Sequence, residues 1–153
     1  MCSFSLETGA YGHNQFAYSP ERGARDAMAY LAIRWMSALA RGRKIGVYCS
    51  DVSGAFDRVN LNRLAAKLKA QKIHPKIVAV LISWLRNRRA RVIVGGESSE
   101  EFALENMIFQ GTVLGPPLWN IFYQDAKRAI EEMMYEECVY ADDLNAYKEY
   151  LGV

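Results

Sequence analysis

The sequence contains 153 residues, of which 51% are hydrophobic, 24% charged and 12% aromatic. This composition is sufficient for the core of one globular domain, and it excludes disordered and collagen-like chains. The longest nearly apolar run, Ile77 to Leu85, is about half as long as a membrane span must be. The N-terminus has no basic region followed by an apolar stretch, so we expect neither a secretory signal nor a membrane partner. The composition therefore predicts an intracellular protein, nuclear or cytoplasmic.

The cysteines are Cys2, Cys49 and Cys138, an odd number at wide spacing. No C-x-x-C pair is present, and the only histidines are His13 and His74. Neither a disulfide framework nor a zinc site can be built from this pattern. We expect three separate thiols in a reducing compartment.

The formal net charge of +2 conceals a strong asymmetry along the chain. Residues 58–91 contain ten Lys and Arg but no Asp or Glu, whereas residues 92–153 contain three Lys and Arg against twelve Asp and Glu. A basic segment of this kind can follow a phosphate backbone. It can equally be a solvated basic surface that pairs with the acidic C-terminal third. Charge alone leaves both interpretations open.

The first predicted elements are an amphipathic helix over residues 24–41 and a strand over residues 45–50. The helix is indicated by apolar residues at helical spacing: Ala24, Ala27, Met28, Leu31, Ala32, Trp35, Met36 and Leu39. Both alternating sets of positions in the strand are largely apolar, which is typical of a strand covered on both faces. Asp51 stands at the end of this strand.

Two helices follow in the basic segment. Asn60 can cap a helix that carries apolar residues on one side, and Pro75 suits the first turn of a second helix that continues to about Asn87. The apolar side of the first of these helices comprises Leu61, Leu64, Ala65 and Leu68.

The next predicted elements are two strands and a long helix. Residues 91–94 and 102–106 have strand composition and are joined around the glycine pair at 95–96. Apolar residues at helical spacing then predict a helix over residues 114–134. Its start is expected near Pro116–Pro117, where missing amide protons cost least.

The last predicted element is a hairpin. Two short apolar runs, residues 138–141 and 144–147, flank Asp142 and Asp143, which we expect to form the turn. The order of elements, without repeats or linkers, predicts a single α+β domain.

The paired acids Asp142 and Asp143 are an electrostatic liability in a tight turn. Like charges about 4 Å apart repel by roughly 1 kcal/mol in water, and glycine or asparagine would form the turn more cheaply. A divalent cation reverses the sign of this cost, because Mg²⁺ binds one or two carboxylates and keeps positions open for water and phosphate oxygens. If the strand that ends at Asp51 is a neighbour in the same sheet, three acids converge in the outline of a two-metal site. Any one of these Asp residues taken alone is better explained as a turn or strand-end residue, whereas the adjacent pair in its hairpin favours the metal site.

Three segments of the sequence resemble the motifs of a known family. The segment DVSGAFD, Asp51–Asp57, is similar to motif A of reverse transcriptases, in particular those of non-LTR retrotransposons and group II introns. QGTVLGPPLWNIF, Gln110–Phe122, resembles motif B, and YADD, Tyr140–Asp143, resembles motif C. A weaker likeness at Asn14–Met28 matches the segment that precedes motif A. The resemblance extends over residues 14–150, and the order and spacing of its motifs make it specific.

The resemblance implies a magnesium site. Asp51 and Asp142 would bind two Mg²⁺ ions, with Mn²⁺ as an alternative ion, and the backbone carbonyl of Val52 would be a further ligand. Asp143 would be a supporting acid. Such a site stabilises the attacking and leaving oxygens of an in-line phosphoryl displacement.

The resemblance also implies a nucleotide site formed by Ala55, Phe56, Gln110 and Gly111. An aromatic ring at Phe56 would leave no room for a ribose 2′-hydroxyl, although the residue is also consistent with an ordinary core aromatic. Gln110 and Gly111 would line the incoming nucleotide and its template partner. Alternatively, the glycine serves only to shape the loop that enters the long helix.

The basic segment lies between motifs A and B, so the resemblance implies that it is near the template-primer duplex. Arg86, Arg88, Arg89 and Arg91 are the candidate contacts to phosphates and sugars. The implied partners are an RNA template with a DNA primer and deoxynucleoside triphosphates.

The implied fold is a right-hand polymerase palm, that is, a ferredoxin-like antiparallel sheet packed on helices, with partial fingers and no thumb. Residues 1–13 carry no motif, and residues 14–153 would form this partial reverse transcriptase domain. We therefore expect an RNA-directed DNA polymerase palm that depends on fingers and thumb regions or on a longer parent polyprotein. The alternative is a non-enzymatic retroelement relic or a domesticated nucleic-acid-binding fragment.

Overall fold

A computed structural model describes residues 14–152 and divides the chain into two compact units. The sheet unit comprises the described residues up to Ser53 and from Tyr123 onward, and the helical unit comprises Gly54–Phe122. None of the helices within the described residues combines the length and the apolarity that crossing a membrane requires.

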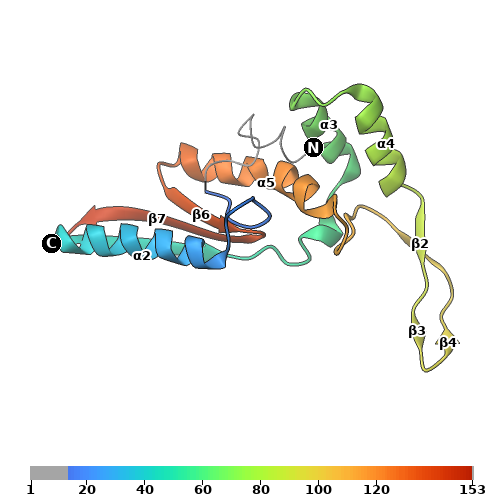
Figure 1. Cartoon of the computed structure of the whole chain (residues 1–153), viewed down its shortest axis with the longest axis horizontal. Coiled ribbons are helices and arrows are strands. Elements are labelled where there is room, and N and C mark those ends of the chain that lie inside the picture. The colour runs from blue at the N-terminus through green and yellow to red at the C-terminus, as the bar shows by residue number, and fades with distance from the viewer. Residues whose placement is uncertain (1–13, 153) are drawn as a thin grey trace. The chain divides into compact units, whose positions relative to one another are not determined.

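The sheet unit is built on three antiparallel strands in the order β1-β7-β6 (Figure 1). The strands are β1 (Arg43–Ser50), β6 (Glu136–Tyr140) and β7 (Asp143–Leu151). Helix α2 (Ala24–Ala40) and the C-terminal part of α5 (Gly115–Glu132) pack on opposite faces of the sheet. The thiol of Cys138 donates to the carbonyl of Ala27 in α2, whereas its neighbour Glu137 lies beside Lys127 in α5. Adjacent strand residues point to opposite faces, so these two contacts assign one helix to each face.

The predicted strand after α2 is present, but the prediction that both of its faces are covered is wrong. Strand β1 lies at the edge of the sheet, and none of its eight residues is buried. Val47 and Tyr48 are both exposed. The prediction was based on the apolar composition of both faces of the strand. Composition does not reveal strand order, and β1 pairs with a single neighbour, β7, which lies far along the sequence.

Both ends of helix α2 lie within one residue of the predicted bounds, 24 and 41. The backbone N–H of Gly23 donates to the carboxylate of Asp26 at 2.7 Å, which fixes the first turn. The predicted apolar face is only partly buried, because Ala27 is in the core while Met28 and Met36 are 72% and 69% exposed.

The first two α-helices of the helical unit are α3 (Leu61–Ala70) and α4 (Pro75–Leu85), as predicted. The side chain of Asn60 caps α3 by accepting from the backbone N–H groups of Asn62 and Arg63. The two helices pack against each other and contribute a continuous set of buried side chains: Leu61, Leu64, Leu68, Val78, Leu81, Ile82 and Leu85. A short 3₁₀ helix, Phe56–Arg58, precedes α3.

The predicted strand pair is an interrupted hairpin. Strand β2 (Arg88–Ala90) pairs with β5 (Phe102–Leu104), and β3 (Ile93–Val94) pairs with β4 (Glu97–Ser98) nearer the tip. Gly95 and Gly96 form the predicted turn, and both have a positive φ, which glycine adopts without steric cost. The first strand begins three residues before its predicted start at Arg91.

The turn of the β6-β7 hairpin is displaced by one residue from the prediction. Tyr140 pairs directly with Asp143, so the two turn residues are Ala141 and Asp142, and Asp143 is the first residue of β7. The long helix α5 begins at Gly115, close to its predicted start.

Candidate active site

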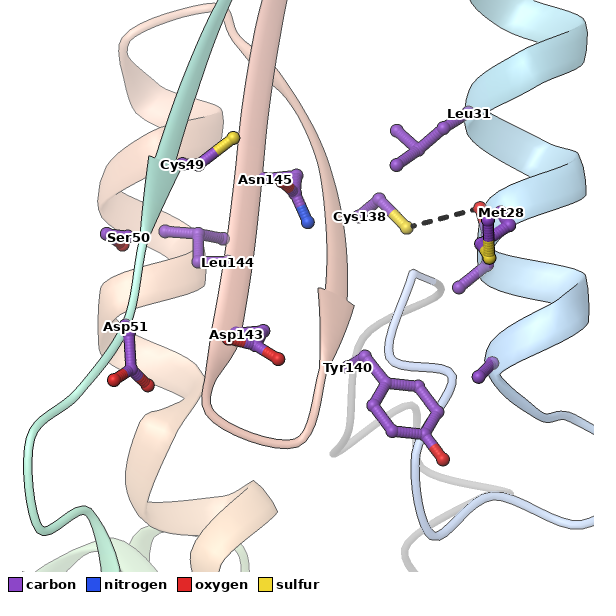
Figure 2. A pocket seen from close by; sticks show the side chains of 12 residues that line it. Met28, Leu31, Cys49, Ser50, Asp51, Cys138, Tyr140, Asp143, Leu144 and Asn145 are labelled. Atoms are coloured by element: carbon purple, nitrogen blue, oxygen red, sulfur yellow. Dashed lines mark hydrogen bonds between the residues drawn. The ribbon is translucent and has the colours of Figure 1, made fainter.

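Asp51 and Asp143 lie opposite each other at one end of the sheet. Ser50, the last residue of β1, pairs with Leu144 of β7, and one further step in the same register places Asp51 across from Asp143. Directly opposed residues of antiparallel strands point to the same face, with Cβ atoms about 5 Å apart. Figure 2 shows both carboxylates at this end of the two strands, and both residues are exposed. Motifs A and C are therefore neighbours in one sheet, which was the condition for their acids to converge.

A cavity of about 490 Å³ opens on this face of the sheet, and Asp51 and Asp143 are part of its lining (Figure 2). One side is the first two turns of α2, which contribute small and apolar residues, including Met28 and Leu31. Cys138 lies deeper, and burial together with the charge of Glu137 raises the pKa of its thiol to about 11. The cavity is thus acidic at one end and apolar along its length.

Asp142 occupies the second turn position and is half-buried. It is outside the lining of the cavity, but its charge acts on two tyrosines. Burial and then the charge of Asp142 raise the pKa of Tyr18, and the same two causes in the same order raise the pKa of Tyr123. The charge of Asp51 also contributes to the raised pKa of Tyr123. One buried phenol on α5 therefore interacts with two of the three predicted metal-binding acids.

Residues 14–152 contain no group of three or more His, Cys, Asp or Glu that could hold a metal ion. The arrangement still fits Mg²⁺, because this ion is usually held by one or two carboxylates and completes its coordination with water and substrate phosphates. Asp51 and Asp143 supply two exposed carboxylates on one face. Val52 follows directly as a half-buried residue after the end of β1, and its carbonyl as a ligand stays a prediction.

Ala55 and Phe56 belong to the core of the helical unit. Phe56 is 8% exposed, and its ring stacks on Trp119 with centroids 5.5 Å apart. The backbone carbonyl of Phe56 accepts from the N–H of Ile108 at 2.8 Å. This environment is that of a core aromatic, and the role of Phe56 in excluding ribonucleotides stays a prediction.

Gln110 and Gly111 are exposed in the loop that leads into α5. Gly111 has a φ of +76°, which strongly favours glycine. Thr112 organises the loop, because its hydroxyl donates to the carbonyl of Phe109 and accepts from the N–H of Gly115. A Cβ atom at Gly115 would come within 2.7 Å of the Phe109 carbonyl oxygen, so the loop requires glycine there.

The four predicted nucleic-acid contacts have different environments. Arg88 lies over the rings of Trp84 and Phe109, 4.7 and 4.2 Å from their centroids, and donates to the carbonyl of Trp84. Arg89 and Arg91 both pair with Glu101, at 3.1 and 3.2 Å. Arg86 donates to the side chain of Asn62. Part of the basic segment is therefore neutralised by an acid from the C-terminal part of the sequence.

Exposed lysines of the basic segment have no such acid nearby. Lys69, Lys72 and Lys76 are exposed, and within the described part of the chain none of them forms an ion pair. Lys69 and Arg86 also line a groove of about 540 Å³ between α3 and α4. Sequence reasoning concentrated on the arginines near the hairpin and overlooked this groove, because helix packing, which forms it, is not visible in the charge pattern.

Sequence reasoning also gave no role to Gln15, which is 1% exposed and contacts the hairpin turn. The sequence signal that could have indicated Gln15 is its position: a polar residue directly before Phe16 and Ala17, in the segment with the weaker likeness to the family.

The chain is similar in sequence and in fold to known reverse transcriptases. Residues 5–150 match the family model described as reverse transcriptase (RNA-dependent DNA polymerase). The RNA-directed DNA polymerase from mobile element jockey of Drosophila funebris is 28% identical over an alignment of 135 residues that covers 85% of this chain and 15% of that protein.

A solved structure with a similar fold is telomerase from Candida albicans, determined in complex with a fragment of telomeric RNA. The two structures superpose with a TM-score of 0.67 at 14% sequence identity, covering 96% of this chain and 28% of the telomerase chain. This chain thus spans a small part of both proteins. The fold is that of a partial palm, with an antiparallel sheet packed on helices. On the match over residues 5–150, the chain belongs to the reverse transcriptase family.

Proposed function

We propose that this chain is the palm of an RNA-directed DNA polymerase, which transfers deoxynucleotides to a primer 3′-hydroxyl under the direction of an RNA template. The observation that supports the proposal is the register of β1 and β7, which ends with Ser50 opposite Leu144 and, continued by one residue, brings Asp51 of motif A across from Asp143 of motif C. This juxtaposition joins two segments that are distant in sequence and that both match the family. It gives the exposed pair of carboxylates that a metal-assisted phosphoryl transfer needs.

In the proposed mechanism, Asp51 and Asp142 would hold two Mg²⁺ ions with help from the carbonyl of Val52, and Asp143 would be a supporting acid. When bound, Mg²⁺ supplies positive charge that makes the primer hydroxyl a better nucleophile and stabilises the leaving oxygen. The carboxylates orient the reacting groups by fixing where that charge lies. The exposure of Asp51 and Asp143 leaves room for substrate oxygens beside them.

Binding of the incoming nucleotide is assigned to the residues of motifs A and B. Gln110 and Gly111 are exposed in a loop whose conformation is fixed by Thr112, so they are available to contact a nucleotide and its template partner. Ala55 and Phe56 would shape the pocket for the sugar from the buried side of motif A. Gly111, which has a positive φ, has no side chain that would hinder a nucleotide from approaching its backbone.

The template-primer duplex would contact the basic segment through phosphates and sugars, since base pairing itself supplies the sequence information. Arg86, Arg89 and Arg91 are exposed and are the candidate contacts, whereas Arg88 contributes mainly by holding the base of the hairpin. Because the chain spans 15% of the jockey protein, we expect further regions of a longer protein to complete the substrate cradle.

Primer extension on an RNA template with Mg²⁺ tests the proposal. The parent chain, alone or joined to the flanking regions of its reading frame, should extend a DNA primer, and Asp51→Asn or Asp142→Asn should nearly abolish extension while leaving duplex binding intact. Glu97→Gln is the matched control, because it removes the same charge from an exposed site at the hairpin tip. Binding without extension in every form would instead favour the non-enzymatic nucleic-acid-binding fragment.

A further inference from the structure

The described chain begins with a short segment that runs beside β6. The N–H of Phe16 donates to the carbonyl of Val139, and the N–H of Val139 donates to the carbonyl of Asn14, both at 2.9 Å. These bonds form a parallel bridge between Gln15 and Val139. The segment thereby covers the edge of the sheet opposite β1, directly next to the motif C turn.

The side chain of Gln15 continues this pairing around the turn. Its Oε1 accepts from the N–H of Ala141 at 3.2 Å and from the N–H of Ala17 at 3.1 Å, and its Nε2 donates to the carbonyl of Ala141 at 3.3 Å. One amide group thus satisfies both backbone groups of Ala141. The residue is 1% exposed, so water cannot substitute for these bonds without opening the structure.

Ala141 needs this support because of its backbone conformation. It has a φ of +59°, in the left-handed region that residues with a Cβ atom rarely adopt. Such conformations persist where the surroundings hold them in place. Ala141 immediately precedes Asp142 and Asp143, so its conformation sets the direction in which both acids leave the turn.

The same segment supplies a further residue at the turn. Tyr18 follows Ala17, also with a positive φ, and the charge of Asp142 is one of the causes that raise the pKa of its phenol, after burial. The hydroxyl of Ser19 donates to the carbonyl of Gln15 at 3.1 Å, which ties the segment to itself. The segment is held beside the turn by its backbone bonds to Val139 and by the side-chain amide of Gln15.

We propose that Gln15 is a positioning residue for motif C: its side-chain amide clamps Ala141 in the left-handed conformation and so fixes where Asp142 and Asp143 lie. The catalytic consequence rests on the proposed polymerase function, whereas the clamp itself does not. Gln15 touches neither substrate nor metal in this role. It acts only through the backbone of Ala141.

Amide hydrogen exchange tests the clamp without requiring activity. In Gln15→Leu, which removes all three bonds at similar volume, exchange at Ala141 should accelerate by about tenfold or more. Exchange in α3 and α4 should be unchanged. Ser19→Ala is the matched control, because it removes a hydrogen bond from the same segment without touching the turn, and it should leave exchange at Ala141 near the parent rate. Unchanged exchange at Ala141 in Gln15→Leu would overturn the proposal.

Two further variants keep the test decisive if Gln15→Leu does not fold. Gln15→Glu retains the acceptor for Ala141 and Ala17 but loses the donor to the Ala141 carbonyl, so its exchange at Ala141 should be intermediate. Ala141→Gly removes the steric cost of the positive φ, so adding it to Gln15→Glu should return exchange at position 141 toward the parent rate. A double variant as perturbed as Gln15→Glu alone would contradict the role assigned to the left-handed turn.

Primer extension then tests the catalytic consequence. Displaced carboxylates should lower kcat by about 10-fold to 100-fold with little change in the KM for deoxynucleotides, and Ala141→Gly should recover part of the loss in Gln15→Glu. If the parent chain is inactive, the polymerase proposal fails while the exchange data still decide the clamp. If the parent is active and Gln15→Glu and Gln15→Leu keep full kcat, the positioning role is wrong.

Discussion

Asp51 and Asp143 set two like charges across from each other at the end of β1 and β7. Like charges on directly opposed strand positions destabilise a sheet. The ladder between β1 and β7 runs from Arg43 opposite Leu151 to Ser50 opposite Leu144 and includes neither acid, so this backbone pairing does not depend on the two carboxylates. The free-energy cost of this repulsion is tolerated at a position where a bound cation would remove it.

Replacement of Asp143 should therefore stabilise the isolated protein. Asp143→Asn is expected to raise the free energy of unfolding by about 0.5 kcal/mol in the absence of divalent ions, because it removes the repulsion from Asp51. Added Mg²⁺ should stabilise the parent and reduce the difference. Urea denaturation with and without Mg²⁺ measures both effects. A less stable Asp143→Asn variant in metal-free buffer would contradict this account.

At Phe56, an effect on core packing can be distinguished from an effect on the selectivity for deoxynucleotides over ribonucleotides. Its ring is buried and stacked on Trp119, so Phe56→Val should cost roughly 2 to 3 kcal/mol of stability through the cavity it leaves. If the ring also excludes a 2′-hydroxyl, the same variant should incorporate ribonucleotides more readily relative to deoxynucleotides. Trp119→Phe is the control, because it disturbs the same stack from the other side. It should lower stability without changing sugar selectivity.

At the scale of elements, the hairpin formed by β2–β5 holds its arginines in two different ways. Arg88 lies over two rings at the base of the hairpin, where the guanidinium contributes packing and a cation–π contact. Arg89 and Arg91 share a single acid, Glu101. The exposed ion pairs add little stability, but they compete with any phosphate for the same guanidinium groups.

Neutralising Glu101 should strengthen nucleic-acid binding. In Glu101→Gln, both Arg89 and Arg91 lose their intramolecular partner, so affinity for an RNA–DNA duplex should rise and its dependence on salt should steepen by about one to two counterions. Fluorescence anisotropy over a series of salt concentrations measures this. Glu97→Gln, in the same hairpin but without an ion pair among the described residues, controls for net charge. Equal effects of the two variants would exclude a specific role for Glu101.

The elements that local patterns define were predictable from the sequence. Helical spacing gave α2 and α5 close to their bounds, the cap at Asn60 and the proline at Pro75 gave α3 and α4, and paired glycines gave the hairpin tip. Each of these signals is contained within a few neighbouring residues. Strand order is different, because β1 lies beside β7 through pairing across almost one hundred residues. Its position at the edge of the sheet therefore could not be deduced from its composition.

The sequence motifs named candidate site residues, whose roles stay predictions, but they did not predict how these residues are arranged. The motifs identified the acids, whereas the displacement of the turn by one residue shows that Asp142 and Asp143 are not equivalent, since only Asp143 belongs to β7. In the observed turn Tyr140 pairs with Asp143, and the Gln15 side-chain amide donates to the carbonyl of Ala141. That contact spans 126 residues, and no local pattern encodes it.

At the scale of the whole molecule, the sheet unit contains several buried protic groups that resist ionisation. Burial is the largest cause of a raised pKa at Cys138, Tyr123 and Tyr147. Buried Glu137 adds to this at Cys138, and it lies beside buried Lys127, whose pKa burial lowers. The unit is thus stabilised in the state in which its thiol and phenols keep their protons.

These raised pKa values predict that the free energy of unfolding falls at alkaline pH and that the thiol of Cys138 accounts for part of the fall. The folded-state pKa of Cys138, about 11, lies above the ordinary value of 9.0, so the unfolded chain loses its proton first. Stability from this group is therefore complete below about pH 9 and is lost as the pH rises through about 11. Urea denaturation across this range should show a smaller fall in the free energy of unfolding for Cys138→Ala than for the parent. Cys49→Ala, which removes an exposed thiol, should follow the parent, and a Cys138→Ala variant with the full alkaline fall would assign the effect to the tyrosines instead.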